Sequence, residues 1–173
     1  MSDAPNEINQ DIKNKLNSFI ISSSEFRGES TYFIEPANIL NVLGVLKTDL
    51  GFTYLADLTA VDYFEVKSPR FEVVYLLHRF GENYEDNTRI RIKSTLADDN
   101  PTIDSATSLW KGADWLEREV YDMFGIIFNN HPDLRRIMMP EDYDEFPLRK
   151  DFDVRNREPS KRSFQKALKE GNF

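Results

Sequence analysis

Apolar and polar positions alternate along the first third of the chain with two different periods. Apolar residues at every fourth position between 8 and 16 predict an amphipathic helix. The serine run 22–24 predicts a break, and the β-branched and aromatic residues of 30–34 predict a strand. A second helix is expected between Pro36, which suits a first helical position, and Gly51, which suits a helix end.

Three more strands are expected at 52–61, 71–78 and 89–93. The stretch 71–78 is apolar on both faces and should lie inside a sheet that is covered on both sides. The stretch 89–93 alternates charged residues with isoleucine and should turn one face to water. After Pro101, apolar residues at helical spacing as far as Trp110 predict a short helix.

The most regular helical pattern follows Asp114. Asp114 and Glu117 have the spacing of a capping box, in which carboxylates accept from the N–H groups of the first turn. Gly125 suits the left-handed residue that ends a helix. One apolar stripe should face the core, formed by Leu116, Val120, Met123, Phe124 and Ile127.

From residue 129 to 152 the sequence shows neither period. Prolines at 132, 140 and 147 forbid a continuous helix or a central strand, and single apolar residues stand between charges. Such a segment has too little apolar surface for a core of its own and is typical of a chain that docks along a partner. We therefore expect an α+β fold with two layers, a mixed β-sheet packed by helices, over residues 1–128. An extended, partner-binding arm should follow over residues 129–173.

Composition limits the chemistry of the chain. Its 173 residues suit one domain plus a tail. The absence of cysteine excludes disulfides, thiolate zinc sites and cysteine-bound iron–sulfur clusters, and two histidines, His78 and His131, are too few for a histidine-based metal centre. The seven glycines are too scattered for a Walker A loop or a dinucleotide fingerprint. No cofactor is expected in this chain.

Charge is unevenly distributed. The net charge is -8, yet residues 155–173 hold six basic and two acidic residues, a balance of +4. This basic end suits an acidic partner surface, anionic lipid or nucleic acid, or simple solvation. No apolar run approaches the ~20 residues of a membrane-spanning helix, and the first residues lack the pattern of a secretory signal. A cytoplasmic location is expected, with membrane contact only through partners.

Acidic residues of the helix after Asp114 admit two interpretations. Glu117, Glu119 and Asp122 suggest acid–base catalysis or a divalent cation site. Residues two apart on a helix point about 200° from each other, so Glu117 and Glu119 cannot share one site. Capping and ion pairing, with Arg118 or with an arginine of a neighbouring chain, are the favoured interpretation.

His131 and the basic pairs are also ambiguous. His131 has the side chain of a general base, but no nucleophile stands in a recognisable motif nearby, which favours a hydrogen-bonded structural histidine. Arg135-Arg136 and Arg149-Lys150 resemble phosphate contacts, but the surrounding acidic residues would repel a nucleic acid. Guanidinium bonds to carboxylates of a partner protein are the simpler account.

One set of residues between 115 and 152 forms a dense pattern: Trp115, Glu117-Arg118-Glu119, Phe128 and the runs 121–126, 131–137, 140–143 and 147–152. This pattern resembles the signature of the 30 kDa subunit of respiratory complex I, whose bacterial form is the C subunit of NADH:quinone oxidoreductase. Two positions depart from the signature. A glycine is expected shortly before the run 147–150, where this chain has Glu145, and a proline is expected directly after Phe152, where it has Asp153.

This resemblance implies a non-catalytic structural subunit of the peripheral arm of a proton-translocating complex. It would lie on the cytoplasmic side of the membrane, packed against the 49 kDa (D) subunit, while FMN and iron–sulfur clusters in partner subunits carry electrons from NADH to quinone. The alternatives are the equivalent subunit of a membrane-bound hydrogenase or other-donor complex, and a free-standing enzyme or adaptor. The expected interface residues are Glu117, Arg118, Glu119, Asp122, His131, Pro132, Arg135, Arg136, Pro140, Asp142, Pro147, Arg149, Lys150 and Asp151.

Overall fold

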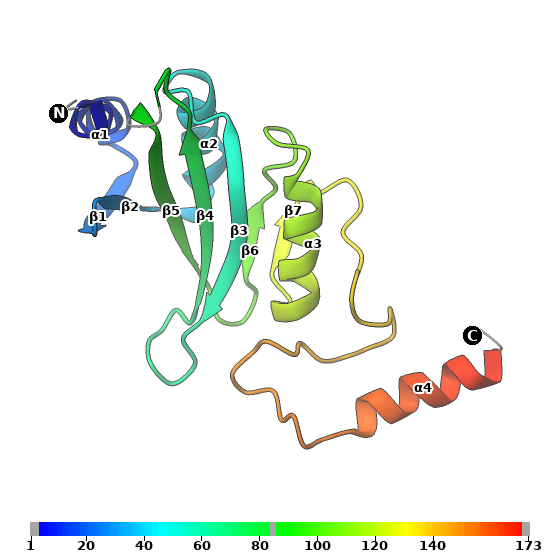
Figure 1. Ribbon diagram of the computed structural model, residues 1–173. Coiled ribbons are helices and arrows are strands. Elements are labelled where there is room, and N and C mark those ends of the chain that lie inside the picture. Colours follow the sequence, from blue (N-terminus) through cyan, green and yellow to red (C-terminus); the bar gives the residue numbers. More distant parts are fainter. Residues whose placement is uncertain (1–3, 84–85, 171–173) are drawn as a thin grey trace.

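A mixed five-stranded sheet forms the centre of the chain (Figure 1). The computed structural model describes residues 4–83 and 86–170. Strand β2 runs parallel to β5, and every other pair of neighbours in this sheet is antiparallel. The strands are β1 (Ile20–Phe26), β2 (Glu29–Ile34), β3 (Tyr54–Asp62), β4 (Phe71–Arg79) and β5 (Thr88–Leu96), in the spatial order β1-β2-β5-β4-β3.

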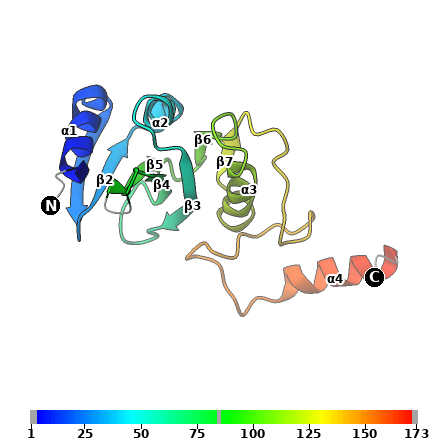
Figure 2. The same ribbon diagram turned by 45° about the horizontal axis from the view of Figure 1, so that its top comes forward.

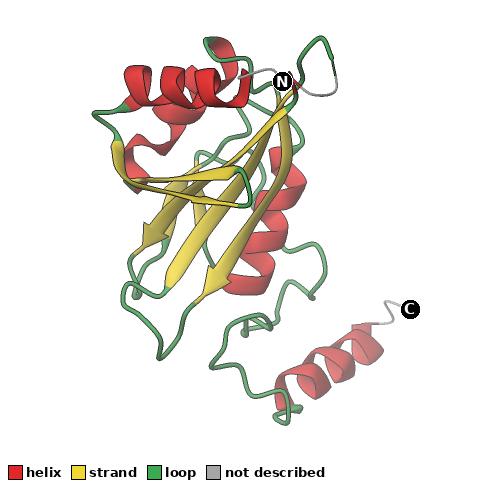
Figure 3. Ribbon diagram, turned by 60° about the vertical axis from the view of Figure 1, so that its left-hand side comes forward, coloured by secondary structure: helices red, strands yellow, loops and turns green. Residues whose placement is uncertain are grey.

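Helices pack on one face of this sheet, as Figure 3 shows for α3, and no helix of the described residues covers the face turned toward the viewer there. A second, two-stranded parallel sheet lies beside α3 (Figures 1 and 2). The helices are α1 (Ala4–Leu16), the 3₁₀ turn η1 (Pro36–Asn38), α2 (Ile39–Thr48), α3 (Ala113–Phe124) and α4 (Glu158–Glu170). The small sheet joins β6 (Thr102–Asp104) to β7 (Ile127–Asn129).

The hydrophobic core lies between the helices and the large sheet. Phe71, Val73, Tyr75 and Leu77 alternate along β4 and are at most 1% exposed. They belong to one buried cluster with apolar residues of helices α1, α2 and α3. Truncation of one of the large side chains to alanine costs about 3–5 kcal/mol at such sites. The two-layer α+β fold predicted from periodicity is therefore confirmed.

Several element predictions are confirmed, and others are wrong. Strand β4 lies inside the sheet, but helices cover only one of its faces. The predicted break at 22–24 is wrong, because these serines lie in β1, an exposed edge strand that tolerates small polar residues. The helix predicted after Pro101 is also wrong. There Ile103 pairs with Phe128 across β6 and β7, and this pairing buries both side chains.

The ends of α3 show one success and two errors. Gly125 ends the helix with a φ of 71°, as predicted. The capping box is wrong, because Gly112 occupies the N-cap position and no side chain caps the helix. Ile127 does not extend the apolar stripe, because it lies beyond Gly125 in β7 and is 41% exposed.

Beyond β7 the chain has no regular structure until α4, which was not predicted (Figure 1). The proposed division between residues 128 and 129 falls within β7 and stays a prediction. The last residues of the basic end, 171–173, lie outside the described residues. Among the described helices, none combines the length and the apolar character needed to cross a membrane.

Candidate interface on the signature helix and the arm

The buried carboxylate of Asp122 fastens the arm to α3. Its Oδ2 accepts the backbone N–H groups of Ile137, Met138 and Met139 at 3.0, 2.7 and 2.9 Å, and its Oδ1 lies 2.7 Å from Nη1 of Arg136. Burial raises the pKa of Asp122, but these donors outweigh it and hold the pKa below its usual range. The ionised side chain of Asp122 on α3 therefore fixes the position of residues 136–139 of the arm.

Two arginines tie the arm to the helix through main-chain carbonyl groups. Arg136 also donates from Nη1 to the carbonyl of Asp122 at 3.0 Å and from Nη2 to the carbonyl of Glu145 at 3.2 Å. Arg118 of α3 donates from Nε to the carbonyl of Arg135 at 3.1 Å. Fixed guanidinium geometry suits such directed contacts, so both arginines order the arm, and Arg136 also neutralises the charge of Asp122.

A third arginine closes the arm onto the end of α3. Arg149 donates from Nε to the carbonyl of Phe124 at 2.6 Å, and its guanidinium lies 5.1 Å from the ring centre of Phe71 and 4.4 Å from that of Phe146. Burial lowers the pKa of Arg149. A Cβ added at Gly125 would lie 2.6 Å from both Nη2 of Arg149 and the Phe146 ring. Gly125 is therefore required for space as well as for its positive φ.

The end of the arm binds to the end of β3. Asp62 Oδ2 accepts the backbone N–H of Lys150 at 2.8 Å, and Arg70 pairs with Asp62 and, at 3.0 Å, with Asp151. Burial raises the pKa of Asp62, but Arg70 and the backbone donors outweigh it and lower the pKa overall. Sequence reasoning missed Asp62 and Arg70, which stand far from the signature.

Glu117 lies at the centre of a buried polar cluster. Its Oε2 accepts from the Ser105 hydroxyl at 2.7 Å and its Oε1 from the Ala106 N–H at 2.6 Å. The His131 ring lies beside this cluster, with its Nε2 3.9 Å from Oε2 of Glu117. Burial, reinforced by the neighbouring charge of Asp114, raises the pKa of Glu117 to about 7 despite these hydrogen bonds.

Both ring nitrogens of His131 have neighbours within the chain. Its Nδ1 lies 3.0 Å from the backbone N–H nitrogen of Asp133, which donates to it, and its Nε2 lies 3.2 Å from the carbonyl oxygen of Asp114. Its side chain is fully buried. The prediction that His131 is a hydrogen-bonded structural histidine is confirmed.

The predicted interface residues divide into two groups. One group is buried or half-buried against the chain itself and holds Glu117, Arg118, Asp122, His131, Arg136, Pro147 and Arg149. The other group is exposed and holds Glu119, Pro132, Arg135, Pro140, Asp142, Lys150 and Asp151.

Several signature charges find partners within the chain itself, and their expected pairing with another subunit stays a prediction. Asp122 and Arg136 bind each other, Glu117 binds Ser105 and Ala106, and Arg135 pairs with Asp133 of its own chain at 2.7 Å. The arm, expected to lie only against a partner, lies against α3 and β3 instead. Its Tyr143 is only 4% exposed.

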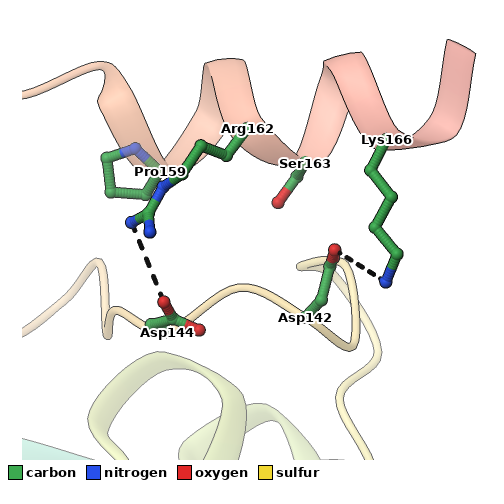
Figure 4. A pocket seen from close by; sticks show the side chains of 6 residues that line it. All are labelled: Asp142, Asp144, Pro159, Arg162, Ser163 and Lys166. Carbon is green, nitrogen blue, oxygen red and sulfur yellow. Dashed lines mark ion pairs between the residues drawn. The ribbon is translucent and has the colours of Figure 1, made fainter. Parts of the chain in front are cut away.

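The basic end of the chain also meets acidic residues of its own arm. In Figure 4, Lys166 and Arg162 of α4 face Asp142 and Asp144, with Nζ–Oδ2 and Nη2–Oδ2 distances of 3.1 and 3.8 Å. A hollow of about 210 Å³ separates helix and arm. All four side chains are at least 36% exposed, so these ion pairs hold α4 weakly.

The outer face of α3 remains exposed. Trp115 is 64% exposed and Arg118 stacks on its ring at 5.1 Å. The side chain of Glu119, one turn later, is exposed and makes neither a hydrogen bond nor an ion pair among residues 4–83 and 86–170. Met138, held in place by Asp122, is 55% exposed. Tryptophan is one of the residue types that are enriched at protein interfaces and dominate their binding energy, so its exposure here marks a candidate contact surface.

Fold and arm together define a two-layer α+β subunit whose C-terminal arm is tied to its signature helix. Residues 32–158 match the family model described as respiratory-chain NADH dehydrogenase, 30 Kd subunit. The chain belongs to this family of oxidoreductase-complex subunits, and the resemblance read from residues 115–152 is confirmed.

Relatives of the chain carry names that agree with this assignment. The C subunit of NADH-quinone oxidoreductase from Citrifermentans bemidjiense is 46% identical over 152 residues, which cover 87% of this chain and 91% of the relative. The mitochondrial NADH-ubiquinone oxidoreductase 30.4 kDa subunit of Neurospora crassa is 47% identical over 139 residues, which cover 79% of this chain and 47% of that protein.

Solved structures show the same fold. The trypsin-resistant fragment (1–134) of Nqo5 matches with a TM-score of 0.63 and 29% identity, over 76% of this chain and 99% of the fragment. A chain of a membrane-bound sulfane sulfur reductase matches with a TM-score of 0.72, over 92% of this chain and 91% of that one. Its identity of 23% supports a shared fold alone.

Proposed function

We propose that the chain is a non-catalytic assembly subunit in the peripheral arm of a proton-translocating NADH:quinone oxidoreductase. It lies on the cytoplasmic side of the membrane and binds the 49 kDa (D) subunit, and FMN and iron–sulfur clusters of other subunits carry the electrons. Support comes from the names of the relatives, which are subunits of NADH-quinone oxidoreductases.

One observation carries this proposal. Asp122 and Arg136 of the signature bind each other and hold the arm against α3, so α3 and the arm form one ordered surface. The same fixation leaves Trp115 and Glu119 facing solvent beside the ordered arm. Side chains carried on an ordered backbone bind with less loss of conformational entropy, which suits a permanent contact with another subunit.

The partner should present a cation beside an apolar pocket. Glu119 supplies an unpaired carboxylate, and Trp115 supplies a large aromatic anchor of the kind that dominates interface energies. The likeness to the sulfane sulfur reductase chain shows a shared fold alone. The alternative, an equivalent subunit of a complex with another electron donor, is distinguished from this proposal by identifying the chains that co-purify.

The test compares assembly with folding. Glu119→Ala should lower the amount of full-size complex on native gels while the urea unfolding midpoint of the isolated chain stays unchanged. Glu25→Ala, on the exposed strand β1, is the matched control and should leave both unchanged. Arg149→Ala should lower both quantities, because Arg149 also binds Phe124 within its own chain. Full-size complex at normal yield in Glu119→Ala and in a Trp115→Ala, Glu119→Ala double variant would contradict the proposal.

A further inference from the structure

A second exposed apolar surface adjoins the end of the arm. The β3–β4 loop, residues 63–70, projects from the end of the sheet near the chain that leads to α4 (Figure 1). At its tip Val66 is 79% exposed, and Phe64 is 37% exposed. Neither residue belongs to the signature from which the interface was predicted.

Hydrogen bonds hold this loop in one shape. The backbone N–H of Tyr63 donates to the carbonyl of Arg70 at 2.8 Å, and the N–H of Val66 donates to the carbonyl of Tyr63 at 2.8 Å. The Ser68 hydroxyl donates to Asp98 at 2.9 Å, and the N–H of Arg70 donates to the same carboxylate. These hydrogen bonds fix the loop with its apolar tip in water. In the isolated chain this conformation buries no apolar surface of the tip, so it gains no hydrophobic stabilisation there.

Arg70 joins the loop to the arm. Its guanidinium pairs with Asp62 at the loop base and with Asp151 in the arm, and it lies 4.4 Å from the ring centre of Phe64. Asp62 in turn accepts the N–H of Lys150. The loop and the last residues of the signature therefore form one continuous surface.

We propose that the β3–β4 loop is a second contact region for the sister subunit that binds the arm, with Val66 and Phe64 packed on an apolar patch of that subunit. The inference rests on the proposed function, and continuity with the arm identifies the occupant. A shallow hollow of about 480 Å³, lined by Phe64, Val66 and Arg70 among others, offers room for a projecting apolar side chain. A second copy of this chain is a poorer occupant, because its net charge of -8 opposes self-association.

The chain contains no cysteine, which permits a direct test with single-cysteine variants. Val66→Cys reports on the loop, Leu148→Cys, at a 51% exposed position, reports on the arm, and Ile21→Cys, at a 59% exposed position on β1, reports general accessibility. Each variant is labelled with a maleimide, in the isolated chain and in the assembled complex, and the mass shift is read on this chain alone.

Assembly should slow the labelling of Val66→Cys and Leu148→Cys by at least about tenfold, because interface cores exclude solvent. Ile21→Cys should change less. Protection at 148 with unchanged labelling at 66 would overturn this inference and leave the proposed function standing. Unchanged labelling at both positions would overturn both. Equal protection at all three positions would also overturn the inference, because it would show general shielding. As a second measurement, Val66→Ser should reduce complex yield at an unchanged unfolding midpoint of the isolated chain.

Discussion

Asp122 and Arg136 form a buried ion pair, with 2.7 Å between Oδ1 and Nη1, across 14 residues of sequence. The same carboxylate accepts three consecutive N–H groups of the arm. Helix α3 and the arm are therefore one structural unit. The chain orders the inner side of its arm by itself and leaves the outer side, with Met138 and Leu148, exposed.

Removal of the Asp122 charge should loosen the arm. Asp122→Ala removes the carboxylate that pairs with Arg136 and accepts three N–H groups, and loss of one partner of a buried pair costs about 3–5 kcal/mol. Urea unfolding should show this loss, and trypsin should cleave faster after Arg136. Asp133→Asn, which removes an exposed ion pair with Arg135, is the control and should leave stability nearly unchanged. Equal stability of the two variants would argue against the role of Asp122 in holding the arm on α3.

Glu117 should make stability fall as pH rises. Its pKa of about 7 in the folded chain exceeds the ordinary value of 4.5, so the folded state binds the proton more tightly than the unfolded state does. The associated stability is fully present below pH 4.5 and is lost as pH rises through 7. The shift corresponds to at most about 3 kcal/mol.

Glu117→Gln keeps the shape of the side chain and removes its titration. The variant should therefore lose less stability than the natural chain between pH 5 and pH 8 in urea unfolding. Because Asp62 and Asp122 have lowered pKa values, their contribution is lost on acidification instead, and the comparison between the two chains cancels it. Identical pH profiles would show that Glu117 does not titrate in this range.

Gly125 and Gly28 form a matched pair. Both have positive φ, 71° and 79°, but a Cβ at Gly125 would meet Arg149 and Phe146, whereas a Cβ at Gly28 meets nothing within 4 Å. Gly28→Ala should cost about 1 kcal/mol from backbone strain alone, and Gly125→Ala should cost clearly more. The difference between their unfolding free energies measures the packing of the arm, and a difference near zero would contradict it.

Salt should release α4 before the rest of the arm. The pairs of Lys166 with Asp142 and of Arg162 with Asp144 are exposed and therefore screened by ions. Trypsin cleavage within α4 should accelerate from about 0.05 to 0.5 M NaCl. Cleavage after Arg136 should stay slow, because its side chain is only 8% exposed. Acceleration at both sites would mean that salt loosens the whole arm.

Local periodicity predicted much of the fold, and contacts distant in sequence account for the errors. The alternation of Phe71 and Val73 and the glycine at 125 are local signals, and the structure agrees with them. The acceptor role of Asp122 was not predictable, because its partners are backbone N–H groups that every residue except proline carries. The pair of Arg70 with Asp151 spans 81 residues, and no pattern in the sequence connects its members.

Amide hydrogen exchange at residues 137–139 of the isolated chain tests the central claim most directly. These three N–H groups are bonded to Asp122 within the chain, so they should exchange slowly without any partner, and the protection should disappear in Asp122→Ala. Exchange at the rate of an unfolded peptide in the isolated chain, with protection gained only in the assembled complex, would contradict the account.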